Sequence, residues 1–98
     1  MVSVSRQQRP AEALMFGTRL RDFRIAKRWS QDRLAEEAGL TLNYVGNLER
    51  GEQTASLTVL LKLCIALEVS APQLLETFSL PVIRRMLRST SLGRRTAQ

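Results

Sequence analysis

The sequence contains no histidine and only one cysteine, and these absences remove several classes of function. A single cysteine forms no internal disulfide, so a reducing cytoplasm is the natural setting. Without histidine and with one thiol, a multi-ligand His/Cys metal site is excluded. No nucleophile has a base beside it, and no glycine-rich loop could cradle a phosphate. We therefore expect a protein that is not an enzyme and that uses no cofactor, metal or small-molecule ligand.

Long hydrophobic runs are also missing. No apolar stretch approaches the ~18–20 residues that a membrane span requires, and the first ten residues lack the hydrophobic core of a secretory signal. Apolar residues make up 44% of the 98 residues and charged residues 24%, which is ordinary for one small globular domain. The pattern contains no internal repeat and no convincing strand, so the sequence predicts an all-α fold without membrane association.

Acidic residues are scarce only at the two ends of the chain. Residues 16–78 carry eight basic and eight acidic side chains, so this central part is neutral, and the net charge of +6 comes from the ends. A polyanion is the partner that such basic ends would attract. The alternative is that they only keep the protein in solution.

Composition divides the chain into three parts. We expect a flexible or partly helical arm over residues 1–15, a helical domain over 16–78, and a basic helix and tail over 79–98. Pro10 suits the first turn of a helix that begins near Ala11. Gly17 interrupts that pattern, so the firm start of the first helix is placed near Phe16, and its end near Arg28.

Residues 30–51 predict two short helices joined by a tight turn. Ser30 caps the first helix, and Gly39 supplies the positive φ that a helix C-terminus needs. Thr41 caps the second helix, which spans residues 41–50 and stops at Gly51. On this second helix two residues face inward, Val45 and Leu48. The opposite face carries Leu42, Asn43, Gly46 and Asn47.

Two further helices complete a predicted five-helix bundle. Ser56 caps a helix that ends near Glu68, and Ser70 caps a short helix that ends by Ser79. The first of these has a wide apolar face, which predicts a central place in the bundle: Leu57, Leu60, Leu61, Cys64, Ile65 and Leu67. A buried, inert thiol is the favoured interpretation of Cys64, over a nucleophile or a redox sensor.

The segment after Pro81 is basic and amphipathic. Its apolar and arginine residues fall on opposite sides of a helix, so it could pack on a second subunit, on its own domain or on a membrane surface. The apolar side carries Val82, Ile83, Met86 and Leu87.

Four stretches together resemble the Cro/cI-type (Xre family) helix-turn-helix regulators: F-G-T-R-L-R-D-F-R, W-S-Q-D-R-L-A-E-E-A-G-L-T, Y-V-G-N-L-E-R-G and S-L-T-V-L-L-K-L-C-I-A-L-E-V. The resemblance covers about residues 16–75 in one ungapped register. It implies a five-helix lambda-repressor-like bundle, here with an extra C-terminal amphipathic helix. It also implies a bacterial or phage-encoded regulator that binds double-stranded operator DNA. Such a protein would be cytoplasmic, and nucleoid-associated when bound.

The resemblance also implies roles for individual residues. Base contacts fall on Leu42, Asn43 and Asn47, of which the two asparagines can bond an adenine edge and the leucine a thymine methyl. Phosphate contacts fall on three residues: Gln31, Tyr44 and Arg50. Tyr44 could instead be only a half-buried aromatic residue, and Gln31 only a first-turn residue.

Three further implications concern stability, charge and assembly. Arg24 and Glu49 match a partly buried ion pair, unless they are two independent surface charges. Glu52 stands where relatives often carry lysine, and it would repel a phosphate. Because one half-site alone would bind weakly, we expect a homodimer on a palindromic operator. Its candidate interface is formed by Leu75, Phe78, Val82, Ile83 and Met86.

The function predicted from the sequence is a dimeric, sequence-specific transcriptional regulator, either a repressor or an autoregulator. Phage repressors, restriction–modification controllers and antitoxins are equally compatible with it. The alternative is a protein-interaction adaptor or antitoxin-type module that keeps the fold without the DNA contact.

Overall fold

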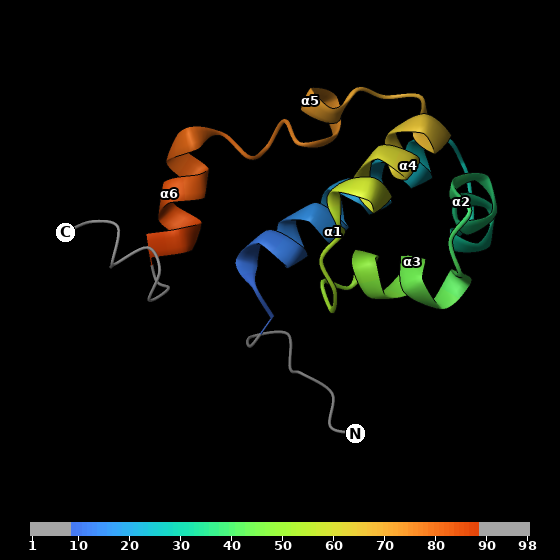
Figure 1. Cartoon of the computed structure of the whole chain (residues 1–98), viewed down its shortest axis with the longest axis horizontal. Helices are drawn as coiled ribbons and strands as arrows, with labels where there is room; N and C mark the ends of the chain where they lie inside the picture. Colours follow the sequence, from blue (N-terminus) through green and yellow to red (C-terminus); the bar gives the residue numbers. More distant parts are fainter. Residues whose placement is uncertain (1–8, 89–98) are drawn as a thin grey trace, which may run out of the picture.

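The computed structural model describes residues 9–88, which form six helices and no strand. The all-α prediction with an additional C-terminal helix is confirmed (Figure 1). Within residues 9–88, no helix is long and apolar enough to cross a membrane. In chain order the helices are α1 (Ala11–Ala26), α2 (Gln31–Ala38), α3 (Leu42–Glu49), α4 (Leu57–Leu67), α5 (Ala71–Leu74) and α6 (Leu80–Arg88).

Side-chain caps fix where the middle helices begin. In each of α2 to α5, the hydroxyl of a serine or threonine accepts a hydrogen bond from the backbone N–H three residues later. This bond satisfies one of the donors that a helix start leaves unpaired. Only α5 completes the box with a glutamine, Gln73. The four capping residues are Ser30, Thr41, Ser56 and Ser70.

Helix α1 begins at Ala11, five residues before the firm start that Gly17 suggested. Gly17 does not interrupt the helix, because its missing side chain serves packing. A Cβ at this position would overlap the carbonyl oxygen of Leu48 and lie 2.6 Å from that of Glu49. The glycine therefore lets the backbone at the end of α3 approach α1 closely.

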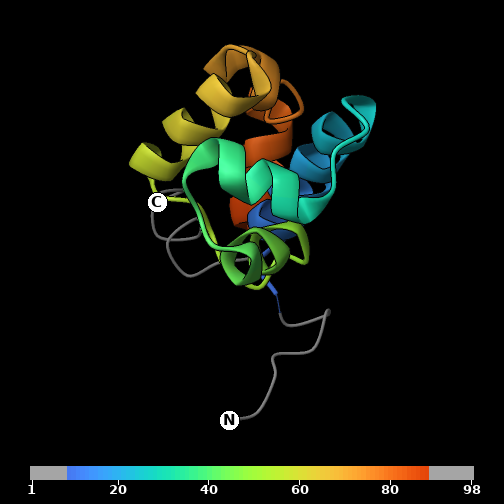
Figure 2. The same cartoon turned by 90° about the vertical axis from the view of Figure 1, so that its right-hand side faces the viewer.

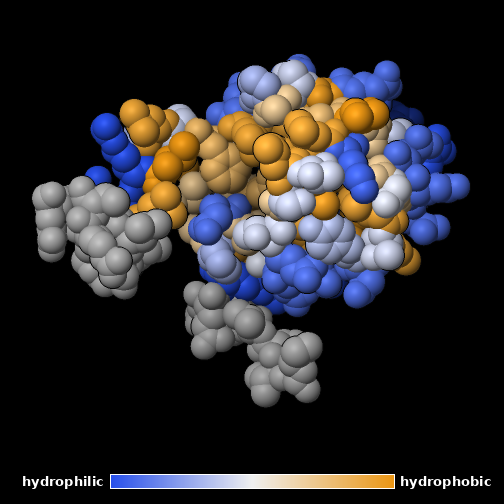
Figure 3. Space-filling view, viewed as in Figure 1, coloured by the Kyte–Doolittle hydropathy of each residue, from blue (hydrophilic) through white to orange (hydrophobic). Residues whose placement is uncertain are grey.

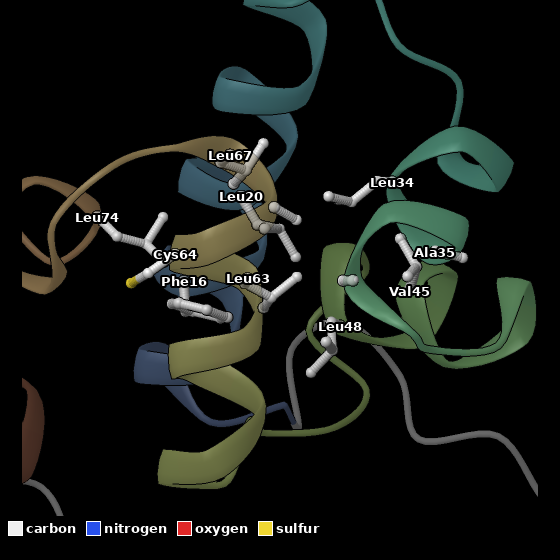
Figure 4. Close-up of a cluster of buried hydrophobic side chains, with 12 residues drawn as sticks. Phe16, Leu20, Leu34, Ala35, Val45, Leu48, Leu63, Cys64, Leu67 and Leu74 are labelled. Atoms are coloured by element: carbon white, nitrogen blue, oxygen red, sulfur yellow. The ribbon is translucent and has the colours of Figure 1, made fainter.

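The hydrophobic core lies where α1, the α2–α3 pair and α4 meet (Figure 4). Helix α3 packs against α1 and α2, while α4 packs against α2 and α5. The thiol of Cys64 is part of this core, and burial raises its pKa, so the inert interpretation fits. The core consists of Phe16, Leu20, Leu34, Ala35, Ala38, Val45, Leu48, Leu63, Cys64, Ala66, Leu67 and Leu74.

Helix α4 buries a narrower face than its sequence predicted. Leu63 is buried, whereas Leu57 and Ile65 are 70% and 79% exposed and Leu61 is also exposed. These three exposed residues are spaced four apart, so they form one stripe along the helix, which we call the α4 stripe. The expected wide core-facing surface was therefore wrong. The apolar residues of α4 extend around more of the helix than the core covers, so those at one edge of the apolar face stay outside it.

Helix α6 stands at the end of the molecule that is far from α2 (Figure 1), and it buries no residue fully. On the face seen in Figure 1, hydrophobic side chains gather over α4 and on α6 (Figure 3). Most of the large exposed apolar residues belong to these two helices, which leaves an apolar surface outside the core. They are Leu57, Leu61, Ile65, Leu80, Ile83 and Leu87, with Ile25 and Leu42 elsewhere.

Candidate nucleic-acid interface

The α2–turn–α3 unit is held together from inside. Ala35 on α2 and Val45 on α3 are buried at their crossing, where the small alanine lets the helices approach. Gly39 has φ +69°, the left-handed conformation that ends α2 and starts the turn. The N–H of Leu40 donates to the carbonyl of Ala35 at 2.8 Å, which closes this helix end. The orientation of α3 is therefore fixed by packing.

The beginning of α3 faces outward. Leu42 is 50% exposed, and Asn43 beside it is exposed as well. Figure 2 shows α3 along the lower edge of the bundle. Asn47 follows one turn later and is half-buried. The three residues predicted to contact bases thus lie on one helix, but only Leu42 and Asn43 are exposed.

The side chain of Asn47 is held by a neighbour at the end of the same helix. Nη2 of Arg50 donates to Oδ1 of Asn47 at 2.6 Å, and Nε of Arg50 donates to Oε2 of Glu52 at 2.8 Å. The amide nitrogen of Asn47 lies 3.5 Å from Oε1 of Gln53, at the outer limit of a hydrogen bond. Arg50, expected to contact a phosphate, is therefore turned back toward its own helix.

The absence of a side chain at Gly46 leaves room for the Arg50 side chain. Sequence spacing put Gly46 on the outward face, yet it is buried. A Cβ there would lie 2.9 Å from Nη1 of Arg50 and 3.6 Å from Cζ. The guanidinium thus covers the glycine, and this placement corrects the expectation that Gly46 is exposed.

Arg9 links the start of the described chain to this network. Its Nη1 donates to the carbonyl oxygen of Arg50 at 2.7 Å, and its Nη2 lies 3.4 Å from Oε1 of Glu52. The sequence placed Arg9 in the basic arm, as one of the charges that would attract a polyanion, and indicated no partner for it within the fold. Its only signal there was positive charge, and contacts with residues more than 40 positions away are not visible in a local pattern.

Glu52 is consequently not an isolated negative charge. The hydrogen bond from Arg50 holds the pKa of its carboxyl below the usual value, and the charges of Arg50 and Arg9 act in the same direction. The carboxylate is therefore ionised at neutral pH but paired with two cations. The repulsion of a phosphate that the sequence suggested is offset by this pairing.

Arg24 and Glu49 form a two-bond ion pair between α1 and α3. Nε of Arg24 donates to Oε2 of Glu49 at 2.7 Å, and Nη2 donates to Oε1 at 3.0 Å. The Glu49 side chain is only 3% exposed. Gln31 donates to the same carboxylate at 3.0 Å, so its side-chain amide is engaged within the protein. This cluster ties the end of α3 to α1 and to the first turn of α2.

Tyr44 is half-buried against the core, and it is one of the residues that line a cleft of ≈ 430 Å³ at the start of α1. Partial burial and a place at the edge of a cleft are compatible with both roles considered for it. The cleft is also lined by Pro10, Ala13, Gly51, Glu52, Gln53 and Thr54.

The residues predicted for a dimer interface differ in their exposure. Leu75 and Phe78 are partly buried and pack against the core of their own chain. Val82 and Met86 on α6 are also partly covered, whereas Ile83 is exposed. The α4 stripe was not predicted as a contact surface, because its residues were assigned to the core.

Comparison with known proteins places this arrangement in a family. Residues 20–74 match the helix-turn-helix family. The control protein C.SmaI of Serratia marcescens is 41% identical over 56 residues, which cover 57% of this chain and 67% of that protein. The control protein C.BamHI of Bacillus amyloliquefaciens is 38% identical over 64 residues, 64% of this chain and 79% of that protein.

A solved structure agrees with these matches. The restriction–modification controller protein C.AhdI from Aeromonas hydrophila superposes with a TM-score of 0.64 at 45% identity, over 65% of this chain and 97% of that one. These relatives and the family are DNA-binding regulators and not enzymes. The chain therefore belongs to the Xre-type family of helix-turn-helix transcriptional regulators.

Proposed function

We propose that this regulator binds a palindromic operator as a homodimer, with the first turn of α3 in the major groove of each half-site. The observation that carries the proposal is an outward-facing helix start held at a fixed angle. Leu42 and Asn43 are exposed there, while Glu49 at the other end is clamped by Arg24. A major groove about 12 Å wide admits such a helix, and preorganisation keeps the entropic cost of binding low.

Sequence is read by three residues in this proposal. Asn43 presents an exposed amide to base edges, and Leu42 supplies an apolar contact for a thymine methyl. Asn47 reads the next base pair from one turn further along α3. Its side chain is half-buried, so it is less accessible to DNA than that of Asn43.

Phosphates are bound at the edges of the same surface. Gln31 lies in the first turn of α2, where backbone N–H groups attract an anion. Its side-chain amide already donates to Glu49, so we assign the phosphate contact mainly to the backbone. Tyr44 and Arg50 are the other two candidates, and Arg50 has to leave Glu52 to reach a phosphate.

A restriction–modification controller is the role that we favour among small regulators. C.SmaI and C.BamHI are named control proteins, and C.AhdI is named a restriction–modification controller. A controller of this kind would act in the cytoplasm of a bacterium, on an operator near its own genes. Glu52 is paired with two arginines, so the phosphate repulsion that would favour the adaptor alternative is offset.

Dimerisation would use the apolar surface outside the core. The predicted residues are Leu75, Phe78, Val82, Ile83 and Met86, and the α4 stripe adds a second exposed apolar area. A two-fold dimer would place two α3 helices on half-sites about one DNA turn apart, ~34 Å. The palindrome of the operator would then mirror the symmetry of the protein.

Operator selection from random double-stranded DNA with the full chain tests the proposal. We expect one palindromic sequence with two half-sites, bound by two chains, with an affinity that falls steeply as salt rises. Asn47→Ala should reduce discrimination at one base pair per half-site by ~1–3 kcal/mol. If no sequence is enriched, the proposed operator binding is wrong. If Asn47→Ala weakens all sequences alike, Asn47 does not read a base.

A further inference from the structure

The amide of Asn47 is oriented by the protein before any DNA is present. A guanidinium only donates hydrogen bonds, so the atom that faces Nη2 of Arg50 at 2.6 Å has to be the amide oxygen. The two hydrogens of the Asn47 amide nitrogen are thereby directed away from Arg50. One of the two amide orientations is thus selected.

Arg50 can hold this position because its own nitrogens are constrained. Nε donates to Glu52 at 2.8 Å while Nη2 donates to Asn47, so both bonds come from one rigid planar group. Glu52 is fixed in turn: its backbone N–H donates to the carbonyl of Asn47 at 2.9 Å, and Arg9 lies 3.4 Å from its other carboxylate oxygen. Gly46 leaves the space that the guanidinium occupies.

We propose that Glu52 and Arg50 are positioning residues for base readout, which fix Asn47 as a hydrogen-bond donor toward the DNA. This inference rests on the proposed function and deepens it, because it assigns what determines the specificity of one reader. It gives Glu52 a role at a place where the sequence suggested only repulsion. In this proposal Arg50 influences base discrimination by orienting Asn47. This role replaces the simple phosphate contact that was expected of Arg50.

The orientation implies a class of base. An adenine edge needs both amide groups, since the oxygen accepts from N6 and the nitrogen donates to N7. In this protein one of the two lone pairs of the oxygen accepts from a cation, which makes the oxygen a weaker acceptor for N6. The nitrogen keeps a hydrogen to donate besides the one that faces Oε1 of Gln53 at 3.5 Å. Guanine offers two acceptors in the major groove, O6 and N7. We therefore expect the base pair read by Asn47 to be a G·C pair, in place of the adenine that the sequence suggested.

The experiment compares base discrimination across matched variants on the selected operator. The base pair read by Asn47 is defined as the one at which Asn47→Ala relaxes discrimination. Arg50→Lys keeps the positive charge but lacks the planar fork that directs both bonds, so discrimination at that pair should fall about tenfold. Glu52→Ala should act similarly. Glu52→Gln removes the same charge but keeps an acceptor for Arg50, so it should stay closer to wild type.

A double-mutant comparison separates positioning from general electrostatics. In the Asn47→Ala background, Arg50→Lys and Glu52→Ala should leave base discrimination unchanged, because the residue they orient is gone. Thermal unfolding of each variant verifies that the domain stays folded.

Several results would overturn the inference while leaving the proposed function intact. These are adenine selected at the Asn47 position, discrimination that Arg50→Lys does not change, equal effects of Glu52→Gln and Glu52→Ala, or no discrimination by Asn47 at all. If the wild-type chain enriches no operator, the proposed function fails and the inference fails with it.

Discussion

Arg24 on α1 and Glu49 at the end of α3 are joined by two hydrogen bonds, of 2.7 and 3.0 Å, in a place where the carboxylate is almost fully buried. The arginine also donates to the carbonyl of Trp29 at 2.8 Å, so it connects α1, the segment before α2 and α3. The helix expected to enter DNA therefore ends on an anchor, and its angle depends on this pair as well as on the core.

Removing Arg24 should destabilise the domain strongly. Arg24→Ala leaves the Glu49 carboxylate buried with only Gln31 as a side-chain donor, and uncompensated buried charges of this kind cost ~3–5 kcal/mol. The free energy of unfolding in urea measures the effect. Arg33→Ala is the control, because it breaks an exposed pair with Glu37 whose contribution is roughly 0.3–0.5 kcal/mol. Equal losses in the two variants would show that the Arg24 pair is exposed in solution.

Because the Glu52 carboxylate is paired with Arg50, we expect it to titrate at a lower pH than an ordinary glutamate. Its pKa is lowered chiefly by the hydrogen bond from Arg50, so the pair stabilises the fold at neutral pH. A native pKa below the unfolded value means that this contribution is complete above about pH 4.3 and is lost as pH falls through the native pKa. Between pH 7 and pH 3, wild type should therefore lose more stability than Glu52→Gln.

Carbon-13 NMR of the Glu52 carboxyl group checks this titration directly. Its midpoint should lie below about 4.3 in wild type and rise toward that value in Arg50→Ala. A midpoint that does not respond to Arg50→Ala would mean that the two side chains are not paired in solution.

The two exposed apolar areas, the α4 stripe and α6, can be tested separately as dimer contacts. Ile65 on the α4 stripe and Ile83 on α6 are exposed, so a charge at either place should leave the folded chain intact while weakening a dimer contact. We expect Ile65→Glu and Ile83→Glu each to shift the protein toward monomer in analytical ultracentrifugation. Ile25→Glu, on α1, is the matched control and should stay dimeric. A variant that remains fully dimeric removes its surface from the proposed interface.

Local signals explain which parts of the fold could be predicted. Ser30 and Thr41 cap helices with their own side chains, and Gly39 takes the positive φ that a helix end requires. Each of these features depends on residues within one turn, so the sequence is sufficient. The α2–turn–α3 unit was predictable for the same reason. Its family resemblance then supplied the candidate contact residues.

Features that depend on distant residues could not be predicted. Arg9 meets Glu52 across 43 positions of sequence, and no local pattern indicates such a contact. The α4 stripe was assigned to the core because Leu57, Leu61 and Ile65 repeat at helical spacing, which shows that they share a face but not which way that face points. The network around Asn47 required the fold to be known.

The two glycines inside helices give the sharpest test of the packing, because their sequence context predicts the same outcome for both. Replacing a helical glycine by alanine should gain up to about 1 kcal/mol from helix propensity alone. The structure predicts opposite results. At Gly17 the new Cβ would meet backbone carbonyl oxygens of α3, including that of Glu49 at 2.6 Å, and backbone cannot swing aside. At Gly46 its nearest neighbours are atoms at the end of the Arg50 side chain, which can move by rotation about its side-chain bonds.

Gly17→Ala should therefore lower the free energy of unfolding by about 1–3 kcal/mol, as overpacking does, whereas Gly46→Ala should equal or exceed wild type. Urea denaturation of the two variants side by side measures this difference. Gly46→Ala should also displace Arg50 and so relax base discrimination at the Asn47 position without loss of stability. A stabilised Gly17→Ala would mean that α1 and α3 lie further apart than described. A Gly46→Ala variant with unchanged discrimination would mean that Arg50 does not orient Asn47.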